Sequence, residues 1–533
     1  MPPHRVDAVV VGAGFAGLYM LHLLRAEGLS VQGIERGDGV GGTWYWNRYP
    51  GCRCDVESID YSYQFDDPLQ LEWQWSERYS AQPEILRYAE HVAERFGVYP
   101  LIRFKTSVVQ ASYNESSQRW TVQTDQGETF DTRFVIMATG CLSTTNTPAF
   151  PGLEGFSGRR FHTGQWPGNG VDFTGRRVGI IGTGSSAIQS IPIIATQAAN
   201  LTVFQRTANF SVPAQNRPLD QAVADRVKAN YADYRQRASQ QQAAFGPDNP
   251  RHFDSVLTAT PEERQRRFED HWQLGGFMFL SAFGDLMVKE EANAHAADFV
   301  RSKIREIVKD PVVAERLSPK GIIGCKRLCA DTGYYETYNR DNVDLVDVSQ
   351  SPIERFTARG LVTGGKEYTF DDVVFATGFD AMTGSLLRMD IRGKSGLSLT
   401  QKWAAGPLTY LGLMIEGFPN LFTMTGPGSP SVLANMVTGV EQHAEYIRDL
   451  IVFMRNKNAG AVEAGIDSEK DWVQMVNVRS ELTLYPRCNS WYLGANVPGK
   501  PRVFMPYIGF PDYTAKLGAV RASGFAGFNL QPS

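Results

Sequence analysis

The same glycine-rich turn occurs twice in this chain, each time between a short apolar run and a helix-like segment. The first turn, Gly12-Ala-Gly-Phe-Ala-Gly17, follows the run 6–11, and the run 30–35 then ends on Glu35. Strand, tight turn, helix, strand and carboxylate in this order are typical of a Rossmann nucleotide-binding unit, whose glycines admit a pyrophosphate to the helix N-terminus. The sequence therefore predicts an α/β fold. The candidate binding residues in this unit are Gly12, Gly14, Phe15, Gly17 and Glu35.

The second turn, Gly182-Thr-Gly-Ser-Ser-Ala187, lies between the runs 177–181 and 201–205. At the position corresponding to Glu35 this unit has Arg206. A carboxylate would repel a 2′-phosphate, whereas a guanidinium binds it through a forked, charge-assisted bond, so the second nucleotide is predicted to be NADPH rather than NADH. The alternative is that Arg206 is a solvated charge at a strand end. The candidate binding residues are Gly182, Thr183, Gly184, Ser185, Ser186, Gln189, Arg206 and Thr207.

Two apolar runs ending in Ala-Thr-Gly, at 138–140 and 376–378, indicate how the units are connected. Small residues let the backbone approach a ligand or a crossing chain closely. We interpret the two runs as the exit from the first unit and the return to it, and the length of 533 residues suggests about three domains. The predicted domains are 1–146 with 378–533 for the first nucleotide, 147–211 with 327–377 for the second, and a charged helical insert at 212–326. Thr260-Pro-Glu-Glu263 and Asp310-Pro311 predict helix starts within the insert.

Composition excludes several other classes of function. The net charge of −4 comes without a basic cluster, which argues against nucleic acid as a partner. No apolar run reaches the ~20 residues of a membrane span, and the first strand begins too early to leave room for a signal peptide, so a cytoplasmic location is expected. The six cysteines lack paired C-x-x-C spacing, so neither zinc nor another metal is expected and all six are predicted to be free thiols.

Between the two glycine turns lies a run with five residues at fixed offsets: Phe156, Gly158, His162, Trp166 and Pro167. Composition alone predicts a loop with one packed histidine. The spacing, however, resembles the F-x-G-x-x-x-H-x-x-x-W-P signature of type I Baeyer–Villiger monooxygenases. The whole chain is similar to this family, most closely to its phenylacetone, steroid and cyclohexanone monooxygenase branch.

The resemblance implies FAD in the first unit, NADPH in the second, and a role for several loops. The loop 41–51 would wrap the flavin, although it could also be a rigid surface turn. Lys326 would reach the NADPH phosphate, while Arg327, paired with Asp55, would act on the flavin peroxide. The further residues are Gly42, Thr43, Trp44, Trp46 and Tyr61 for the flavin, Trp491 for the nicotinamide and substrate, and Ser431, Val432, Leu433 and Met436 for the substrate pocket. The segment around Gly509 departs from the family pattern and leaves the pocket shape there undecided.

The implied reaction is oxidation of a ketone to an ester or lactone with NADPH and O2. Bulky aromatic, cyclic or steroid-like ketones are the expected substrates, with sulfoxidation as a side activity, and the protein is expected to be a monomer. Three alternatives stay open: a flavin-containing N- or S-oxygenase, a disulfide reductase, and a non-catalytic flavin-binding redox sensor. The pair Cys52-Arg-Cys54 is too tightly spaced for the usual disulfide reductase arrangement.

Overall fold

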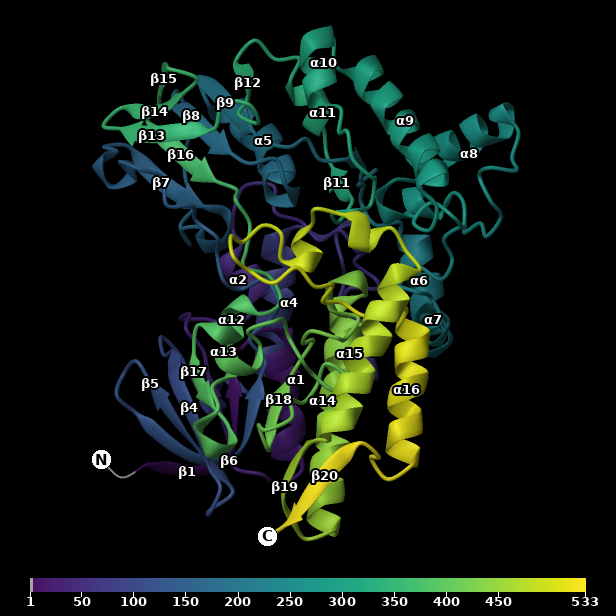
Figure 1. The fold of residues 1–533 in the computed structure, drawn as a ribbon. Coiled ribbons are helices and arrows are strands. Elements are labelled where there is room, and N and C mark those ends of the chain that lie inside the picture. The colour runs from purple at the N-terminus through teal and green to yellow at the C-terminus, as the bar shows by residue number, and fades with distance from the viewer. Residues whose placement is uncertain (1–2) are drawn as a thin grey trace.

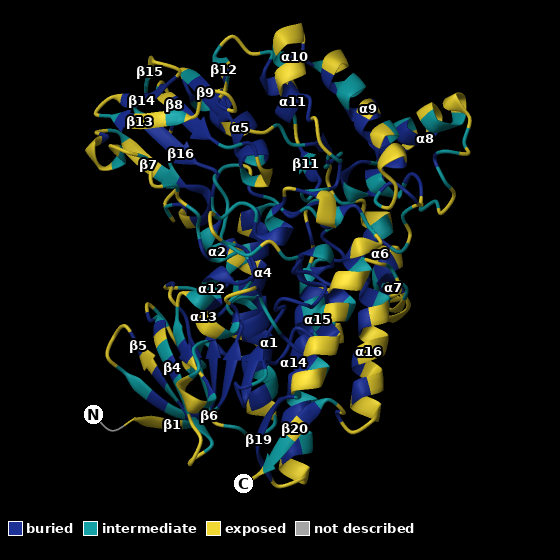
Figure 2. Ribbon diagram, viewed as in Figure 1, coloured by how far each residue is buried: buried dark blue, intermediate teal, exposed yellow. Residues whose placement is uncertain are grey.

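The structure, a computed structural model, describes residues 3–533. Two separate β-sheets carry helices against them, and a further group of helices lies beside the second sheet (Figure 1). The buried residues concentrate along the central strands of each sheet and on the helix faces turned toward them (Figure 2). The α/β fold predicted from the two glycine turns is therefore confirmed.

The first sheet has eight strands in the order β17-β4-β5-β6-β1-β2-β3, with β18 paired to β6. Its centre is parallel, because β1 pairs with β2 on one side and β6 on the other. Strands from both halves of the chain therefore build this sheet. The elements of this lobe up to the first crossing are β1 (His4–Val11), α1 (Phe15–Ala26), β2 (Val31–Ile34), α2 (Thr43–Trp46), α3 (Asp67–Glu72), α4 (Gln82–Arg95), β3 (Ile102–Arg103), β4 (Val108–Asn114), β5 (Arg119–Thr124) and β6 (Thr129–Met137).

The C-terminal part of the chain completes this lobe. Helix α14 lies against α1, and the pair β19–β20 closes the end where the chain terminates (Figure 1). Its elements are α12 (Gly384–Leu387), β17 (Asp390–Arg392), α13 (Leu399–Lys402), β18 (Leu421–Thr423), α14 (Met436–Asn456), β19 (Ala459–Ala464), α15 (Ile466–Glu481), α16 (Phe510–Ala522) and β20 (Phe528–Pro532).

The second sheet is parallel throughout, in the order β12-β9-β8-β16-β7. A three-stranded antiparallel sheet, β13–β14–β15, lies beside it. The elements are β7 (Arg159–His162), β8 (Arg177–Ile181), α5 (Ser185–Gln197), β9 (Asn200–Gln205), α11 (Tyr334–Thr337), β12 (Val343–Asp347), β13 (Ile353–Thr357), β14 (Gly360–Thr363), β15 (Lys366–Thr369) and β16 (Asp372–Phe375).

The helices of the insert lie between two short strands that pair with each other, β10 (Ser211–Pro213) and β11 (Cys329–Asp331). Thr260 caps α8 by accepting a hydrogen bond from the Glu263 amide at 3.2 Å, and Asp310 caps α10. Both predicted helix starts are confirmed. The helices are α6 (Gln221–Lys228), α7 (Tyr231–Ser239), α8 (Pro261–Leu274), α9 (Glu290–Ile307) and α10 (Pro311–Leu317).

The cysteines contradict one prediction. Cys325 and Cys488 form a disulfide with their Cα atoms 5.4 Å apart, although 163 residues separate them in sequence. The prediction of six free thiols is therefore wrong for this pair, because sequence spacing carries no sign of a meeting between such distant loops. The other four cysteines are free and buried. Within residues 3–533, no helix has both the length and the apolar character needed to cross a membrane.

Candidate active site

At the first glycine turn, the backbone approaches too closely for any side chain. Gly12 has φ 107°, and a Cβ there would lie 2.5 Å from the Ala138 carbonyl oxygen. A Cβ on Gly17 would lie 1.9 Å from the Gly12 oxygen. Gly14 and Gly42 face each other, since a Cβ on Gly42 would lie 2.8 Å from the Gly14 Cα. The two glycine loops therefore keep the N-terminus of α1 free of side chains.

Glu35, which directly follows β2, binds this turn through both of its carboxylate oxygens. Its Oε2 accepts a hydrogen bond from the Ala13 amide at 2.8 Å, and its Oε1 accepts one from the Gly37 amide at 2.7 Å. The side chain is buried, with 6% of its surface exposed. The carboxylate thus orders the turn itself, a function that the sequence pattern does not reveal.

An aromatic group flanks the same turn. Trp44 donates from its indole nitrogen to the Tyr61 hydroxyl at 3.1 Å, and the Phe15 and Tyr61 ring centroids lie 5.9 Å apart. Trp46, on α2 with Thr43, lies beneath the Arg36 guanidinium at 4.4 Å. Tyr61 packs edge to face against both Phe15 and Trp44, so aromatic side chains line this side of the turn.

The second glycine turn repeats the geometry of the first. Gly182 has φ 114°, and a Cβ there would lie 2.5 Å from the Ala376 oxygen. Ala138 and Ala376 are therefore equivalent contact points, which accounts for the two matching Ala-Thr-Gly runs. A Cβ on Gly184, by contrast, would meet no atom within 4 Å. The N-terminus of α5 is open at this position.

Side chains around the second turn bond to neighbouring segments. Thr183 donates to the Thr207 carbonyl at 2.9 Å, and Gln189 donates to the Arg53 carbonyl at 3.0 Å. Gln189 thus joins α5 to the loop after α2. The hydroxyls of Ser185 and Ser186 lie 3.2 Å from the Cys329 sulfur and 3.0 Å from the Thr163 hydroxyl, respectively.

Arg206 and Lys326 bring two positive charges together at this turn. Burial lowers the pKa of Lys326, and the nearby Arg206 charge lowers it further. Among the described residues, neither side chain has an acidic partner within ion-pair distance. Neighbouring cations without a carboxylate partner are suited to an external anion such as a phosphate.

Arg327 is held in a different way. Its Nε and Nη2 donate to the two Asp55 carboxylate oxygens at 2.6 and 2.9 Å, and Nη1 donates to the Val432 carbonyl. The Phe277 ring lies 4.5 Å from the guanidinium carbon. Burial alone would lower the pKa of Arg327, but the Asp55 carboxylate outweighs it and keeps the pKa above its ordinary value. Arg327 therefore stays charged.

The sequence signature lies where the chain crosses between the two sheets. The His162 Nδ1 accepts a hydrogen bond from the Gly164 amide at 3.0 Å, and its Nε2 lies 3.3 Å from the Thr377 hydroxyl. Burial lowers the pKa of His162, so the ring is neutral near pH 7. Phe156 and Trp166 are buried, a Cβ on Gly158 would lie 2.5 Å from the Asp371 oxygen, and Pro167 directly follows Trp166.

The predicted pocket loop reaches Arg327 through Val432. Ser431 and Val432 are buried in the 3₁₀ turn η6 (Ser431–Leu433), Leu433 ends this turn partly buried, and the partly buried Met436 begins α14. Trp491 begins the 3₁₀ turn η8 (Trp491–Leu493), and its ring lies 4.2 Å from that of Tyr492.

Sequence reasoning missed two residues of this site, Phe277 and Tyr492. Burial raises the pKa of Tyr492, and the Arg327 charge partly opposes this, so the phenol lies close to the guanidinium. Tyr492 could have been found, because it directly follows Trp491 in a stretch that resembles the family. Phe277 lies in the insert, where no sequence pattern marks it.

Comparison with known proteins identifies the family. A model described as flavin-binding monooxygenase-like matches residues 5–228. A Baeyer–Villiger monooxygenase from Pseudooceanicola batsensis is 44% identical over 97% of this chain and 95% of its own length. The chain belongs to the type I Baeyer–Villiger monooxygenases. This flavin-dependent monooxygenase is also 40% identical to the phenazine N-monooxygenase PhzNO1 of Lysobacter antibioticus, over 98% of this chain and 97% of that protein.

Solved structures of Baeyer–Villiger monooxygenases superimpose over nearly the whole chain. An oxidised steroid monooxygenase bound to NADP is 52% identical, with a TM-score of 0.94 and coverage of 99% of this chain and 100% of that one. A closed form of cyclohexanone monooxygenase is 41% identical, with a TM-score of 0.97 and full coverage of both chains. The family resemblance inferred from the signature is therefore confirmed.

Proposed function

We propose that this Baeyer–Villiger monooxygenase uses NADPH, FAD and O2 to convert bulky aromatic, cyclic or steroid-like ketones into esters or lactones. The observation that carries the proposal is the forked Arg327–Asp55 pair, which places a permanent positive charge beside the predicted pocket loop. The balance is ketone, O2, NADPH and one proton giving ester, NADP⁺ and water. The greater identity to the steroid monooxygenase, 52% against 41% for cyclohexanone monooxygenase, supports the larger substrates.

The first nucleotide site fits FAD. Gly12, Gly14 and Gly42 place no side chain at the N-terminus of α1, so a pyrophosphate could approach the backbone there, where the helix dipole favours negative charge. Glu35, whose two oxygens also accept from the Ala13 and Gly37 amides, would hold the ribose. When bound, the flavin supplies the transfer of one oxygen atom from O2, a reaction that amino-acid side chains cannot perform.

The second site fits NADPH. Arg206 and Lys326 would hold the 2′-phosphate, because their charges lie together and have no carboxylate partner among the described residues. Gly182 forms the tight turn against Ala376, and Gly184, where an added Cβ would meet no atom within 4 Å, leaves the N-terminus of α5 open to the pyrophosphate. Trp491 would contact the nicotinamide and the substrate.

Arg327 is the residue we propose for catalysis. Attack on a ketone carbonyl places a negative charge on its oxygen, and a fixed cation in a site that excludes water stabilises that charge. The guanidinium cannot give up its proton near pH 7. Asp55 fixes its orientation and Phe277 covers one of its faces. Ser431, Val432, Leu433 and Met436 would line the substrate pocket.

The test is a substrate panel with the purified protein, in which NADPH consumption and oxidised products are both measured. Aromatic, cyclic and steroid-like ketones should accelerate NADPH consumption and give esters or lactones, with a smaller amount of sulfoxide from an aryl sulfide. Oxidation of short linear ketones alone would contradict the proposed substrate class. N-oxides from a phenazine without any ester would favour the N-oxygenase alternative, and NADPH consumption unaffected by every substrate would favour a redox sensor.

A further inference from the structure

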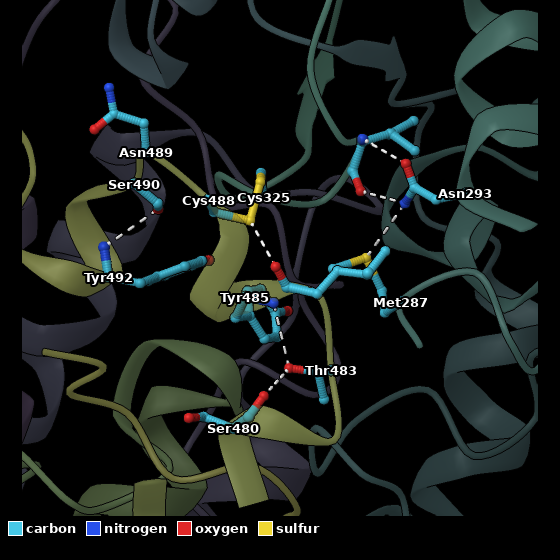
Figure 3. Close-up of a disulfide and its surroundings, with 12 residues drawn as sticks. Met287, Asn293, Cys325, Ser480, Thr483, Tyr485, Cys488, Asn489, Ser490 and Tyr492 are labelled. Carbon is cyan, nitrogen blue, oxygen red and sulfur yellow. Dashed lines mark hydrogen bonds between the residues drawn. A yellow bond between two sulfur atoms is a disulfide. The ribbon is translucent and has the colours of Figure 1, made fainter. Parts of the chain in front are cut away.

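The Cys325–Cys488 disulfide joins two loops that both carry residues of the candidate active site (Figure 3). Cys325 directly precedes Lys326 and Arg327, and Cys488 lies three residues before Trp491. One loop leads into β11 and the other follows α15. The disulfide is therefore a covalent link between the segment of the proposed catalytic arginine and the segment of the proposed nicotinamide contact.

The Cys325 side of this link is fixed to the helical insert. Asn293, on α9, donates to the Ile323 carbonyl at 2.9 Å and accepts from the Ile323 amide at 3.0 Å (Figure 3). Gly324 follows with φ 85°, and a Cβ there would lie 2.5 Å from the Met287 sulfur. The loop is thus already positioned where it reaches Cys325.

The Cys488 side has weaker noncovalent support. The Leu484 amide donates to the Met287 carbonyl at 2.9 Å. Arg487 pairs with Glu290 at 2.7 Å, but both side chains are 64% exposed, and such a surface ion pair contributes little to stability. The disulfide is the covalent attachment of this loop to the insert.

Beyond η8, the same loop is attached to the segment that follows β16. Asn496 donates to the Phe379 carbonyl at 2.6 Å, and Lys500 pairs with Asp380 at 2.6 Å. Phe379 and Asp380 follow β16, where the chain returns toward the first sheet. The turn η8 thus lies between an attachment to this return segment and the disulfide at Cys325, and it is also held by the hydrogen bond that the Met505 amide donates to the Tyr492 carbonyl at 3.1 Å.

We propose that the Cys325–Cys488 disulfide positions η8 against Lys326 and Arg327, and thereby sets NADPH affinity and the coupling of NADPH oxidation to ketone oxidation. The inference rests on the proposed function of these residues. Both cysteines act as positioning residues, because neither is placed against the reacting atoms. A dithiol breaks the bond by giving each sulfur one electron and one proton, and itself becomes a cyclic disulfide. With η8 released, water would reach the site, and NADPH, a proton and O2 would yield NADP⁺ and H2O2 in place of ester.

Thiol titration of the denatured protein establishes the state of the bond. Aerobically purified enzyme should show four of its six cysteines as free thiols, and enzyme treated with dithiothreitol should show six. Six free thiols in the untreated protein would overturn the proposal.

The functional test compares the same folded enzyme before and after reduction with dithiothreitol. Reduction should raise the KM for NADPH by about threefold or more and lower the yield of ester per NADPH, since small displacements of positioning groups have large kinetic effects. The kcat for flavin reduction at saturating NADPH should change little. The double variant Cys325→Ser with Cys488→Ser should match reduced wild-type enzyme and ignore dithiothreitol.

Other outcomes separate the possible failures. A lower melting temperature after reduction, with KM and ester yield unchanged, would make the bond merely structural and would overturn the proposal. If the untreated enzyme oxidised no ketone, the proposed function would fail by itself. NADPH affinity, measured by titration of protein fluorescence, would then still test whether reduction releases η8.

Discussion

Three positive charges near the active site differ in what holds them. Arg327 has the Asp55 carboxylate as a forked partner, whereas Arg206 and Lys326 have no acidic partner among the described residues. A paired cation keeps its orientation and its charge, while an unpaired cation gains most when an anion arrives from outside. The pattern fits a catalytic role for the first and phosphate binding for the other two.

Removing the guanidinium at position 206 should alter coenzyme preference. Arg206→Ala should weaken NADPH binding by about 1.5–3 kcal/mol, the range for a hydrogen bond to a charged group. This corresponds to a rise of about 10- to 150-fold in the KM for NADPH. NADH, which has no 2′-phosphate, serves as the control in the same steady-state assay and should be affected little. Equal losses for both coenzymes would refute the assignment.

Substitution of Arg327 should separate flavin reduction from ketone oxidation. In Arg327→Ala, NADPH should still reduce the flavin, but ester formation should fall by about a hundredfold or more, as when a donor to a developing oxyanion is removed. Arg327→Lys keeps the charge but loses the fork to Asp55, and should therefore retain part of the activity. Stopped-flow reduction and product analysis give the two readouts. Near-normal ester yield in the alanine variant would show that the pair is only a structural salt bridge.

Residues with a local sequence signal could be predicted, and residues defined only by the fold could not. Gly12 and Arg206 stand at fixed offsets from a strand, so the pattern indicates their surroundings directly. Phe277 reaches Arg327 from the insert, and Cys325 meets Cys488 across 163 residues. Such contacts depend on how distant segments pack, and a single sequence contains no record of that.

At the scale of elements, the two nucleotide units share one contact that explains their common pattern. Gly12 approaches the Ala138 oxygen and Gly182 approaches the Ala376 oxygen at the same 2.5 Å, measured from an added Cβ. In each unit a strand ending in Ala-Thr-Gly lies against the glycine turn of another strand. The sequence predicted both turns and both runs, but only the structure shows that they touch.

This contact makes a prediction about the second unit. Gly182→Ala combines φ 114° with a clash against backbone, so it should abolish NADPH binding while FAD stays bound in the other unit. Gly184→Ala is the control for folding alone, because its added Cβ meets no protein atom within 4 Å but lies at the proposed pyrophosphate site; the fold of this variant should be preserved. Flavin absorbance and NADPH titration measure the two sites. Normal NADPH affinity in Gly182→Ala would contradict the geometry.

At the scale of the whole molecule, the insert is attached to the first lobe through buried polar groups. Tyr234, on α7, donates to the Asp60 carboxylate at 3.1 Å, and Arg235 donates to the Asp60 carbonyl at 3.0 Å. Asn435, which caps α14 behind the pocket loop, donates to the same carbonyl at 2.7 Å. Asp60 therefore connects the insert, the first lobe and the base of the pocket loop. No sequence pattern indicates this junction, because its members are distant in the chain and follow no motif.

The protonation of Asp60 should make stability depend on pH. Burial raises its pKa to about 7, partly opposed by the Arg235 charge and reinforced by Glu57. Because the pKa of Asp60 is raised in the folded state, protonated Asp60 contributes fully to stability below the unfolded pKa of 3.8. This contribution is lost as the pH rises to about 7. The Asp60→Asn side chain cannot ionise and can still accept a hydrogen bond from the Tyr234 hydroxyl. This variant should therefore not lose stability as the pH rises. Its melting temperature minus that of the wild type should increase from pH 4 to pH 7 and then level off.

Glu441→Gln is the matched comparison. Burial raises the pKa of Glu441 to about 8, so for this variant the difference in melting temperature should continue to grow up to that pH. A difference for Asp60→Asn that stayed constant across this range would show that Asp60 is already ionised in the folded protein, with Arg235 outweighing the effect of burial.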